Sequence, residues 1–307
     1  EAAENMAQEM DFQLRYYEPE ASEVFYLGTQ REGQTGVTTT TGTPKIKYTS
    51  QYNAYNTNDG SLIWNTPLEV KGALSHVSFL DNGLLVLPDD GNRTKINVFD
   101  YQTKEGLWGK NGRGIKIKGG IYDYLVSGDG ILLVSRTDNN DFLNFLDPSI
   151  GAITFEKPVK VEGTVVGIVP LDNSILYITT TSINILDHKT GTLKWKNSLQ
   201  TSPSLTAEHD GKIYAYDYNS GLVKVVDITT EQLSELSNEN LEFDGKEIPK
   251  QLEIMEDGIF LYSDQNVAKY NFDGSLSFQK YYAAPKEAGW KRALLYGASV
   301  RAAYIGA

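Results

Sequence analysis

Residues 183–195, INILDHKTGTLKW, form the segment from which the fold of this chain is deduced. An apolar strand runs into an Asp, the chain reverses at Thr-Gly, and a Trp follows eight residues after the Asp. Related segments occur at 51–64 (QYNAYNTNDGSLIW), 96–108 (INVFDYQTKEGLW), 143–155 (LNFLDPSIGAITF), 223–235 (VKVVDITTEQLSE) and 267–279 (VAKYNFDGSLSFQ). A period of roughly 40–50 residues is typical of β-propeller blades. The repeat predicts an all-β propeller of four-stranded blades. Six blades are visible in the sequence, and the full protein could have seven or eight.

A second pattern supports the blades. Continuous apolar runs open with tight-turn residues at 81–87 (DNGLLVL), 128–135 (GDGILLVS), 172–179 (DNSILYIT), 209–217 (HDGKIYAYD) and 256–263 (EDGIFLYS). Turns of the Asp-Gly and Asn-Gly type favour β-hairpins because they need a positive φ. Strands so continuously apolar are expected to be buried on both faces, as blade walls are.

Each recurring residue of the repeat has a structural role that follows from its chemistry. The Asp accepts hydrogen bonds from the turn, the Gly supplies a left-handed backbone position, and the aromatic fills the wedge between neighbouring blades. The repeat residues to which these roles are assigned are Trp64, Asp100, Trp108, Asp147, Gly151, Phe155, Asp187, Gly191, Trp195, Asp227, Gly274 and Phe278.

Three regions are expected along the chain. Residues 1–23 form a linker with a short strand at 12–17, which either closes the ring by pairing with the last blade or belongs to a further blade. Residues 24–281 form the propeller, within which the Gly/Thr/Gln-rich stretch 28–43 is expected to be a flexible hairpin loop. Residues 282–307 form a helical segment, and we expect the chain to be part of a longer polypeptide.

The C-terminal segment is a candidate docking helix. Trp290, Leu294 and Ala298 recur at four-residue spacing and would lie on one helix face. The segment could pack on its own propeller, on a partner protein, or at a membrane surface.

Composition excludes several classes of function. The 307 residues carry a net charge of −12, which disfavours nucleic acid and anionic lipid as partners. The absence of Cys excludes disulfides, thiolate metal sites and cysteine nucleophiles. No run of 18 apolar residues is present, so no membrane-spanning helix is expected.

Histidine, aspartate and tyrosine side chains offer other possible sites. His188 and His209 fall in predicted turns and are expected to be solvated. Asp138 and Asp141 offer oxygen ligands, but the spacing does not match a calcium loop, and a polar hairpin is expected. The 19 Tyr residues suit either a recognition rim or ordinary strand positions.

Residues 184–196 (NILDHKTGTLKWK) and 53–65 (NAYNTNDGSLIWN) resemble the quinoprotein-type repeat, and the resemblance extends over about residues 45–280. That family includes pyrroloquinoline-quinone dehydrogenases and non-catalytic exported bacterial propellers, among them the lipoprotein of the outer-membrane β-barrel assembly machine. The fifth repeat departs most, with Glu231 in place of the Gly and Glu235 in place of the aromatic. The vicinal disulfide common in the dehydrogenases is impossible here, and no residue matches their active-site motifs.

The resemblance implies a non-enzymatic scaffold that holds other proteins at a bacterial envelope complex, exported to the periplasm or the outer membrane. No catalytic, cofactor-binding or metal-binding residue is assigned, and a protein partner of unknown identity is expected. The alternative is a ligand-binding or enzymatic propeller acting on sugar or peptide, or a relic of a quinone-dependent dehydrogenase. Acidic groups with raised pKa around the channel would favour the alternative, whereas an apolar, Tyr-rich rim would favour the scaffold.

Overall fold

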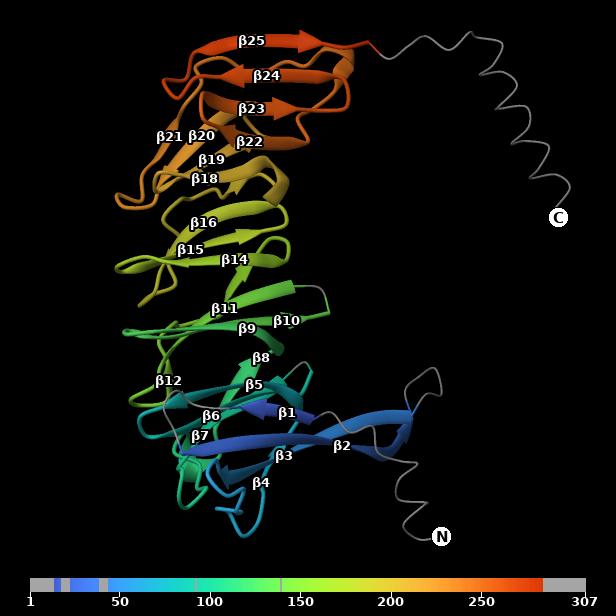
Figure 1. Cartoon of the computed structure of the whole chain (residues 1–307), viewed down its shortest axis with the longest axis vertical. Coiled ribbons are helices and arrows are strands. Elements are labelled where there is room, and N and C mark those ends of the chain that lie inside the picture. The colour runs from blue at the N-terminus through green and yellow to red at the C-terminus, as the bar shows by residue number, and fades with distance from the viewer. Residues whose placement is uncertain (1–13, 18–22, 39–43, 92, 139, 284–307) are drawn as a thin grey trace, which may run out of the picture. The chain divides into compact units, whose positions relative to one another are not determined.

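The computed structural model describes residues 14–17, 23–38, 44–91, 93–138 and 140–283. Over these residues the chain forms six antiparallel sheets that succeed one another in sequence (Figure 1). Apart from the last short strand of the third sheet, consecutive strands are hydrogen-bonded neighbours within each sheet, which is the meander of a propeller blade. The prediction of an all-β propeller with four-stranded blades is therefore confirmed. The chain divides into two compact units, Glu1–Leu199 and Gln200–Ala307.

The first three sheets lie in the first unit. The first contains β1 (Leu14–Tyr17), β2 (Val24–Thr38), β3 (Pro44–Asn56) and β4 (Leu68–Lys71). The second contains β5 (Ala73–Leu80), β6 (Gly83–Asp89), β7 (Arg93–Phe99) and β8 (Ile115–Lys118). The third contains β9 (Gly120–Ser127), β10 (Gly130–Thr137), β11 (Asn140–Asp147) and two short outer strands that both pair with β11, namely β12 (Ala152–Ile153) and β13 (Val159–Val161).

The other three sheets repeat this order. The fourth contains β14 (Val165–Pro170), β15 (Ser174–Thr179), β16 (Ser182–Asp187) and β17 (Leu199–Gln200), where the two units divide. The fifth contains β18 (Thr206–His209), β19 (Lys212–Asp217), β20 (Leu222–Asp227) and β21 (Leu233–Glu235). The sixth contains β22 (Gln251–Met255), β23 (Gly258–Tyr262), β24 (Asn266–Tyr270) and β25 (Leu276–Tyr281). Short 3-10 turns occur at η1 (Lys110–Gly112), η2 (Pro203–Leu205) and η3 (Asp244–Lys246).

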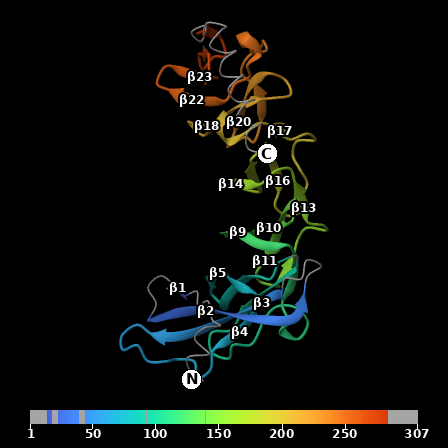
Figure 2. The same cartoon turned by 90° about the vertical axis from the view of Figure 1, so that its right-hand side faces the viewer.

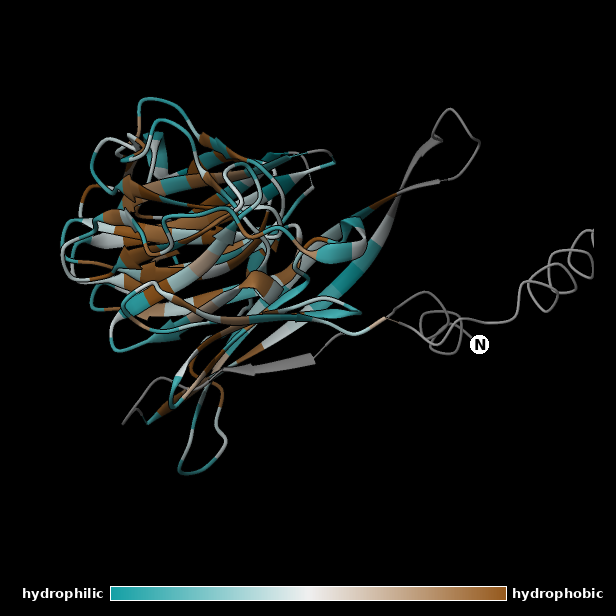
Figure 3. Cartoon of the chain, turned by 90° about the horizontal axis from the view of Figure 1, so that it is seen from above, coloured by the Kyte–Doolittle hydropathy of each residue, from teal (hydrophilic) through white to brown (hydrophobic). Residues whose placement is uncertain are grey.

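The core lies between neighbouring sheets, and the second strand of each blade supplies much of it. Hydrophobic residues are concentrated along the strands and hydrophilic ones along the connections (Figure 3). In the first unit, Leu85 of β6 and Leu133 of β10 are fully buried in one cluster. In the second unit, Val223 of β20 and Leu261 of β23 are fully buried in another. The apolar runs seen in the sequence are thus the buried blade walls.

The N-terminal part differs from expectation in two places. The short strand β1 pairs with β2, with Leu14 opposite Thr29, so the first sheet begins at Leu14. A hairpin is present here, but a flexible loop is wrong for residues 28–38, which belong to β2; residues 28–34 and Thr38 pair with β3. These two strands extend well beyond the others of their sheet (Figures 1 and 2). Backbone pairing fixes this ribbon, and Thr suits it as a β-branched residue.

The outer strand is interrupted in the first four sheets. In the first, second and fourth sheets, a single bridge forms at Leu62, Gly106 or Leu193, and the chain leaves the sheet before it returns as β4, β8 or β17. In the third sheet the same break separates β12 from β13. In the fifth and sixth sheets the outer strands β21 and β25 are continuous. The repeat aromatics of the first four blades lie at the break.

Candidate functional site

Three of the four aromatics at these breaks reach into the neighbouring blade. Trp64, Trp108 and Phe155 are at most 4% exposed. The indole nitrogen of Trp64 donates to the carbonyl oxygen of Tyr101 at 2.8 Å, and that of Trp108 donates to Pro148 at 3.1 Å. Both acceptors directly follow the turn Asp of the next blade. Because the outer strand is interrupted, the aromatic side chain does not have to point to one face of its own sheet and can fill the wedge between two neighbouring blades.

Two other repeat aromatics are placed differently. Trp195 is only partly buried. Phe278 lies within the continuous strand β25, is also partly buried, and contacts Phe260 edge-on, with ring centroids 6.3 Å apart. A continuous outer strand keeps this aromatic beside its own sheet.

The turn aspartates bind their own turns. The Oδ1 atom of Asp100 accepts hydrogen bonds from the backbone amides of Gln102 and Thr103 at 2.9 and 2.7 Å, and Asp187 makes the corresponding bonds to Lys189 and Thr190. The amide of Thr103, followed by that of Gln102, lowers the pKa of Asp100. Asp147 and Asp227 each accept a similar bond from their turns. The left-handed position of these turns holds Gly60, Gly151, Gly191, Lys104 and Glu231, and Gly274 holds it in the shorter sixth turn.

An Asn three residues before the Asp is a part of the repeat that was not recognised in the sequence. It is visible in the segments INVFD, LNFLD and INILD. The Oδ1 atom of Asn97 accepts a hydrogen bond from the backbone amide of Trp108 at 2.9 Å, and Asn184 accepts one from Trp195 at 3.2 Å. The buried Asn side chain therefore holds the backbone of the aromatic residue in place where the outer strand breaks.

The fifth blade lacks all three of these features. Lys224 replaces the Asn and pairs with Asp217 at 3.0 Å. Glu231 replaces the Gly and keeps its left-handed backbone, with φ of 57°. Because β21 is continuous, Glu235 pairs opposite Lys224. The next residue, Leu236, takes the place against the sixth turn, where its carbonyl oxygen would lie 1.9 Å from a Cβ on Gly274.

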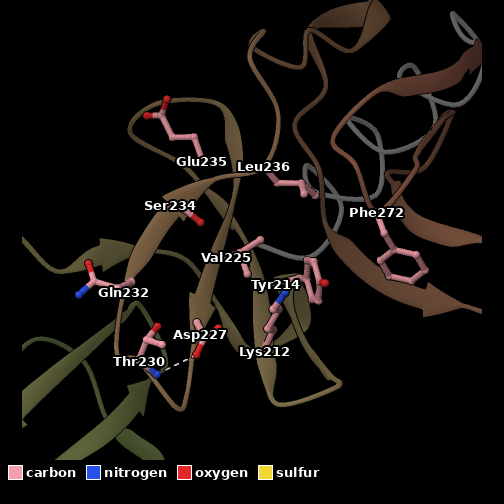
Figure 4. A pocket seen from close by; sticks show the side chains of 10 residues that line it. All are labelled: Lys212, Tyr214, Val225, Asp227, Thr230, Gln232, Ser234, Glu235, Leu236 and Phe272. Carbon is pink, nitrogen blue, oxygen red and sulfur yellow. Dashed lines mark hydrogen bonds between the residues drawn. The ribbon is translucent and has the colours of Figure 1, made fainter.

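An open hollow of about 270 Å³ adjoins Leu236 (Figure 4). Its floor is one face of the fifth sheet, and Phe272, from the turn of the sixth sheet, stands at its side (Figure 4). Leu236 is smaller than the aromatics that fill the wedges of the earlier blades. The lining residues are Lys212, Tyr214, Val225, Asp227, Thr230, Gln232, Ser234, Glu235, Leu236 and Phe272.

Phe272 is the exposed aromatic of this hollow, with 36% of its surface accessible. The His209 ring stacks on it, with centroids 5.1 Å apart and an interplanar angle of 14°. The Tyr214 ring meets it edge-on at 6.0 Å. Because His209 does not line the hollow, the stack holds the ring from outside it.

The two blades that form the hollow are acidic in composition. Residues 200–283 contain fifteen Asp and Glu side chains against six Lys and no Arg. Three of the six Lys, namely Lys224, Lys250 and Lys269, are in ion pairs. Most of the negative charge of these two blades is therefore left to attract cations.

Asp141, one of the two oxygen ligands that the sequence offers for calcium, belongs to a hydrogen-bond network inside the fold. It is 3% exposed and accepts two hydrogen bonds from Arg136, at 2.7 and 2.9 Å, and one from the Tyr122 hydroxyl at 2.5 Å. The backbone amide of Val165 in the next blade donates to it at 3.0 Å. Desolvation acts to raise the pKa of Asp141, but these donors outweigh it and lower the pKa. Its oxygens are thus committed to joining the third and fourth sheets.

The histidines are also placed. His188 is 4% exposed and stacks on Phe145 at 5.1 Å, so the prediction that it is solvated is wrong. His188 directly follows the turn residue Asp187, and its side chain contacts the preceding blade. His209 is partly exposed beside Phe272.

Trp290, Leu294 and Ala298 of the predicted docking helix lie outside the described residues. Among the described residues, no helix has the length and apolar character needed to cross a bilayer.

Comparisons with known proteins show no family relationship. No protein-family model matches the sequence, and no curated protein matches it. The chain is similar to the solved structure of BamB from Moraxella catarrhalis, with 17% identity over 75% of this chain and 70% of that one and a TM-score of 0.36. It is also similar to a putative 6-phosphogluconolactonase from Bacteroides uniformis, with 13% identity over 88% and 85% of the chains and a TM-score of 0.35. TM-scores this low assign no function, and the quinoprotein-type resemblance stays a prediction.

Proposed function

We propose that this chain is a non-enzymatic β-propeller scaffold that binds a protein partner in a bacterial envelope complex. The observation that carries the proposal is the hollow beside Phe272. It occurs in the one blade where the Asn, the Gly and the aromatic of the repeat are all replaced. An aromatic held open at the surface is typical of protein-binding sites.

Several carboxylates form hydrogen bonds or ion pairs that hold the fold together, which supports a structural role for them. Asp141 joins two sheets, and Asp217 pairs with Lys224. Glu247 accepts a hydrogen bond from Asn266 at 2.7 Å and fixes a loop of the last sheet. The exported, envelope-associated part of the proposal rests on the resemblance of the repeat to the quinoprotein type.

Site-specific photocrosslinking in the native host tests this function. The photoreactive residue p-benzoylphenylalanine replaces Ser234, which lines the hollow, or Ile150, a control that is 70% exposed in the first unit. We expect one envelope protein to crosslink from position 234 and not from position 150. Equal crosslinking from both positions, or none from position 234, would contradict the proposal.

A further inference from the structure

The Phe272 ring, which lines the hollow, is suited to a positive charge. An aromatic ring face is electron-rich and attracts Lys or Arg when the cation lies within about 6 Å of the centroid. The stack with His209 fixes the ring, and Tyr214 fixes its edge. A ring held from outside the hollow is preorganised, so little side-chain entropy is lost when a ligand binds.

The other phenylalanines of the sixth sheet already carry cations. Lys269 Nζ lies 5.6 Å from the centroid of Phe260, and Lys280 Nζ lies 5.8 Å from that of Phe278. In the part of the chain that the structure describes, no Lys or Arg lies over Phe272. Phe272 therefore differs from Phe260 and Phe278, because a cation over its ring can come from another molecule.

Carboxylates stand around the same hollow. Asp227 and Glu235 line it, and Lys212, opposite Asp227 in the sheet, offsets one of the two charges. The net charge of the two blades, fifteen acidic side chains against six Lys, is also negative and adds a negative field. This field favours a basic partner over an acidic one.

We propose that the hollow takes an arginine or lysine side chain of the protein partner, with the cation over Phe272 and the Asp227 and Glu235 carboxylates elsewhere in the lining of the hollow. This assignment rests on the proposed scaffold function and names the chemistry of the partner. The occupant is a basic segment, and the planar guanidinium of arginine suits both the ring and a carboxylate.

A titration followed by amide NMR tests the proposal on the full chain. The probe is N-acetyl-arginine amide, added to about 50 mM because one side chain binds weakly. The control is N-acetyl-citrulline amide, which has nearly the same shape without the charge. We expect the arginine probe to shift amides at 212–214, 234–236 and 271–273, and the citrulline probe to leave them in place. Added salt should weaken binding.

Two substitutions assign the effect to the ring. Phe272→Leu keeps the apolar side chain without the aromatic face and should weaken probe binding about three- to tenfold. Tyr282→Ala removes another exposed aromatic, 62% accessible, and should leave binding unchanged. Equal shifts with both probes, no shifts with arginine, or full binding by Phe272→Leu would overturn the assignment. If crosslinking at position 234 persists in that case, the scaffold function stands and only the cationic occupant is lost.

Discussion

The indole of Trp108 lies directly on the backbone of Gly151 in the next blade. A Cβ built on Gly151 would lie 2.3 Å from Cδ1 of Trp108. Phe155 meets Gly191 in the same way, at 3.0 Å. The Gly of the repeat therefore has two functions, because it allows the left-handed turn and leaves room for the aromatic of the preceding blade.

Gly151→Ala tests this contact. The added methyl group must displace the indole, and the alanine must adopt a φ of 59°. We therefore expect a loss of about 2–4 kcal/mol of unfolding free energy. Gly60→Ala is the matched control, because Gly60 has φ of 71° at the same turn position and no atom within 4 Å of its Cβ. It should cost about 1 kcal/mol. Urea unfolding measures both, and equal losses would refute the packing function.

Truncation of the aromatics should follow their burial. Trp108→Ala should cost about 3–5 kcal/mol because it leaves a cavity between two sheets. Trp195→Ala should cost less, about 1–2 kcal/mol, since this side chain is only partly buried. Thermal and urea unfolding of the two variants compare them. The idea that burial at the break sets the cost fails if Trp195→Ala is the more destabilising.

The buried asparagines offer a second matched pair. Asn97 donates to the carbonyl of Gly112 at 2.9 Å and accepts from Trp108. In Asn144, the Nδ2 atom has no partner among the described residues. We expect Asn97→Ala to cost about 2–3 kcal/mol and Asn144→Ala about 1 kcal/mol less. Chemical denaturation measures the unfolding free energy of the two variants. Equal losses would contradict a stabilising function of the Asn97 hydrogen bonds.

Much of the fold could be predicted from the sequence, because turn chemistry and apolar runs are local. The Asp and Gly of each turn, and runs such as 128–135, carry their signal within a few residues. The break in the outer strand could not be predicted, since β8 returns to its sheet seven residues after Trp108. Tertiary pairing fixes such returns, and no local preference marks them.

The candidate site was only half visible in the sequence. The departures at Glu231 and Glu235 could be recognised, but the hollow depends on β21 being continuous and on Leu236 meeting Gly274. Phe272 follows the last apolar strand at a turn position, and its stack with His209 depends on a residue of the preceding blade. The burial of His188 likewise depends on Phe145, 43 residues earlier in the chain. Long-range contacts of this kind leave no mark in the periodicity.

Acid should destabilise the fold through the turn aspartates. Hydrogen bonds in the turns lower the pKa of Asp59, Asp100 and Asp273. Since the folded pKa lies below the unfolded value of about 3.9, the stabilisation is present above that value and is lost as pH falls through the folded pKa. Urea midpoints should stay level from about pH 7 to pH 5 and fall below about pH 4. Asp100→Asn should lose part of this slope, and an unchanged slope would exclude Asp100 as a contributor.

The network at Asp141 should matter for stability without any metal. Asp141→Ala removes the acceptor of Arg136, Tyr122 and the Val165 amide, so we expect a loss of about 2–4 kcal/mol. Tyr122→Phe removes one donor and should cost about 1 kcal/mol. A chelator should leave the Tm of the parent protein unchanged, because the oxygens of Asp141 are occupied by donors of the chain. A fall of several degrees with chelator would instead assign Asp141 to a bound cation, since loss of a ligand that binds only the folded state lowers Tm.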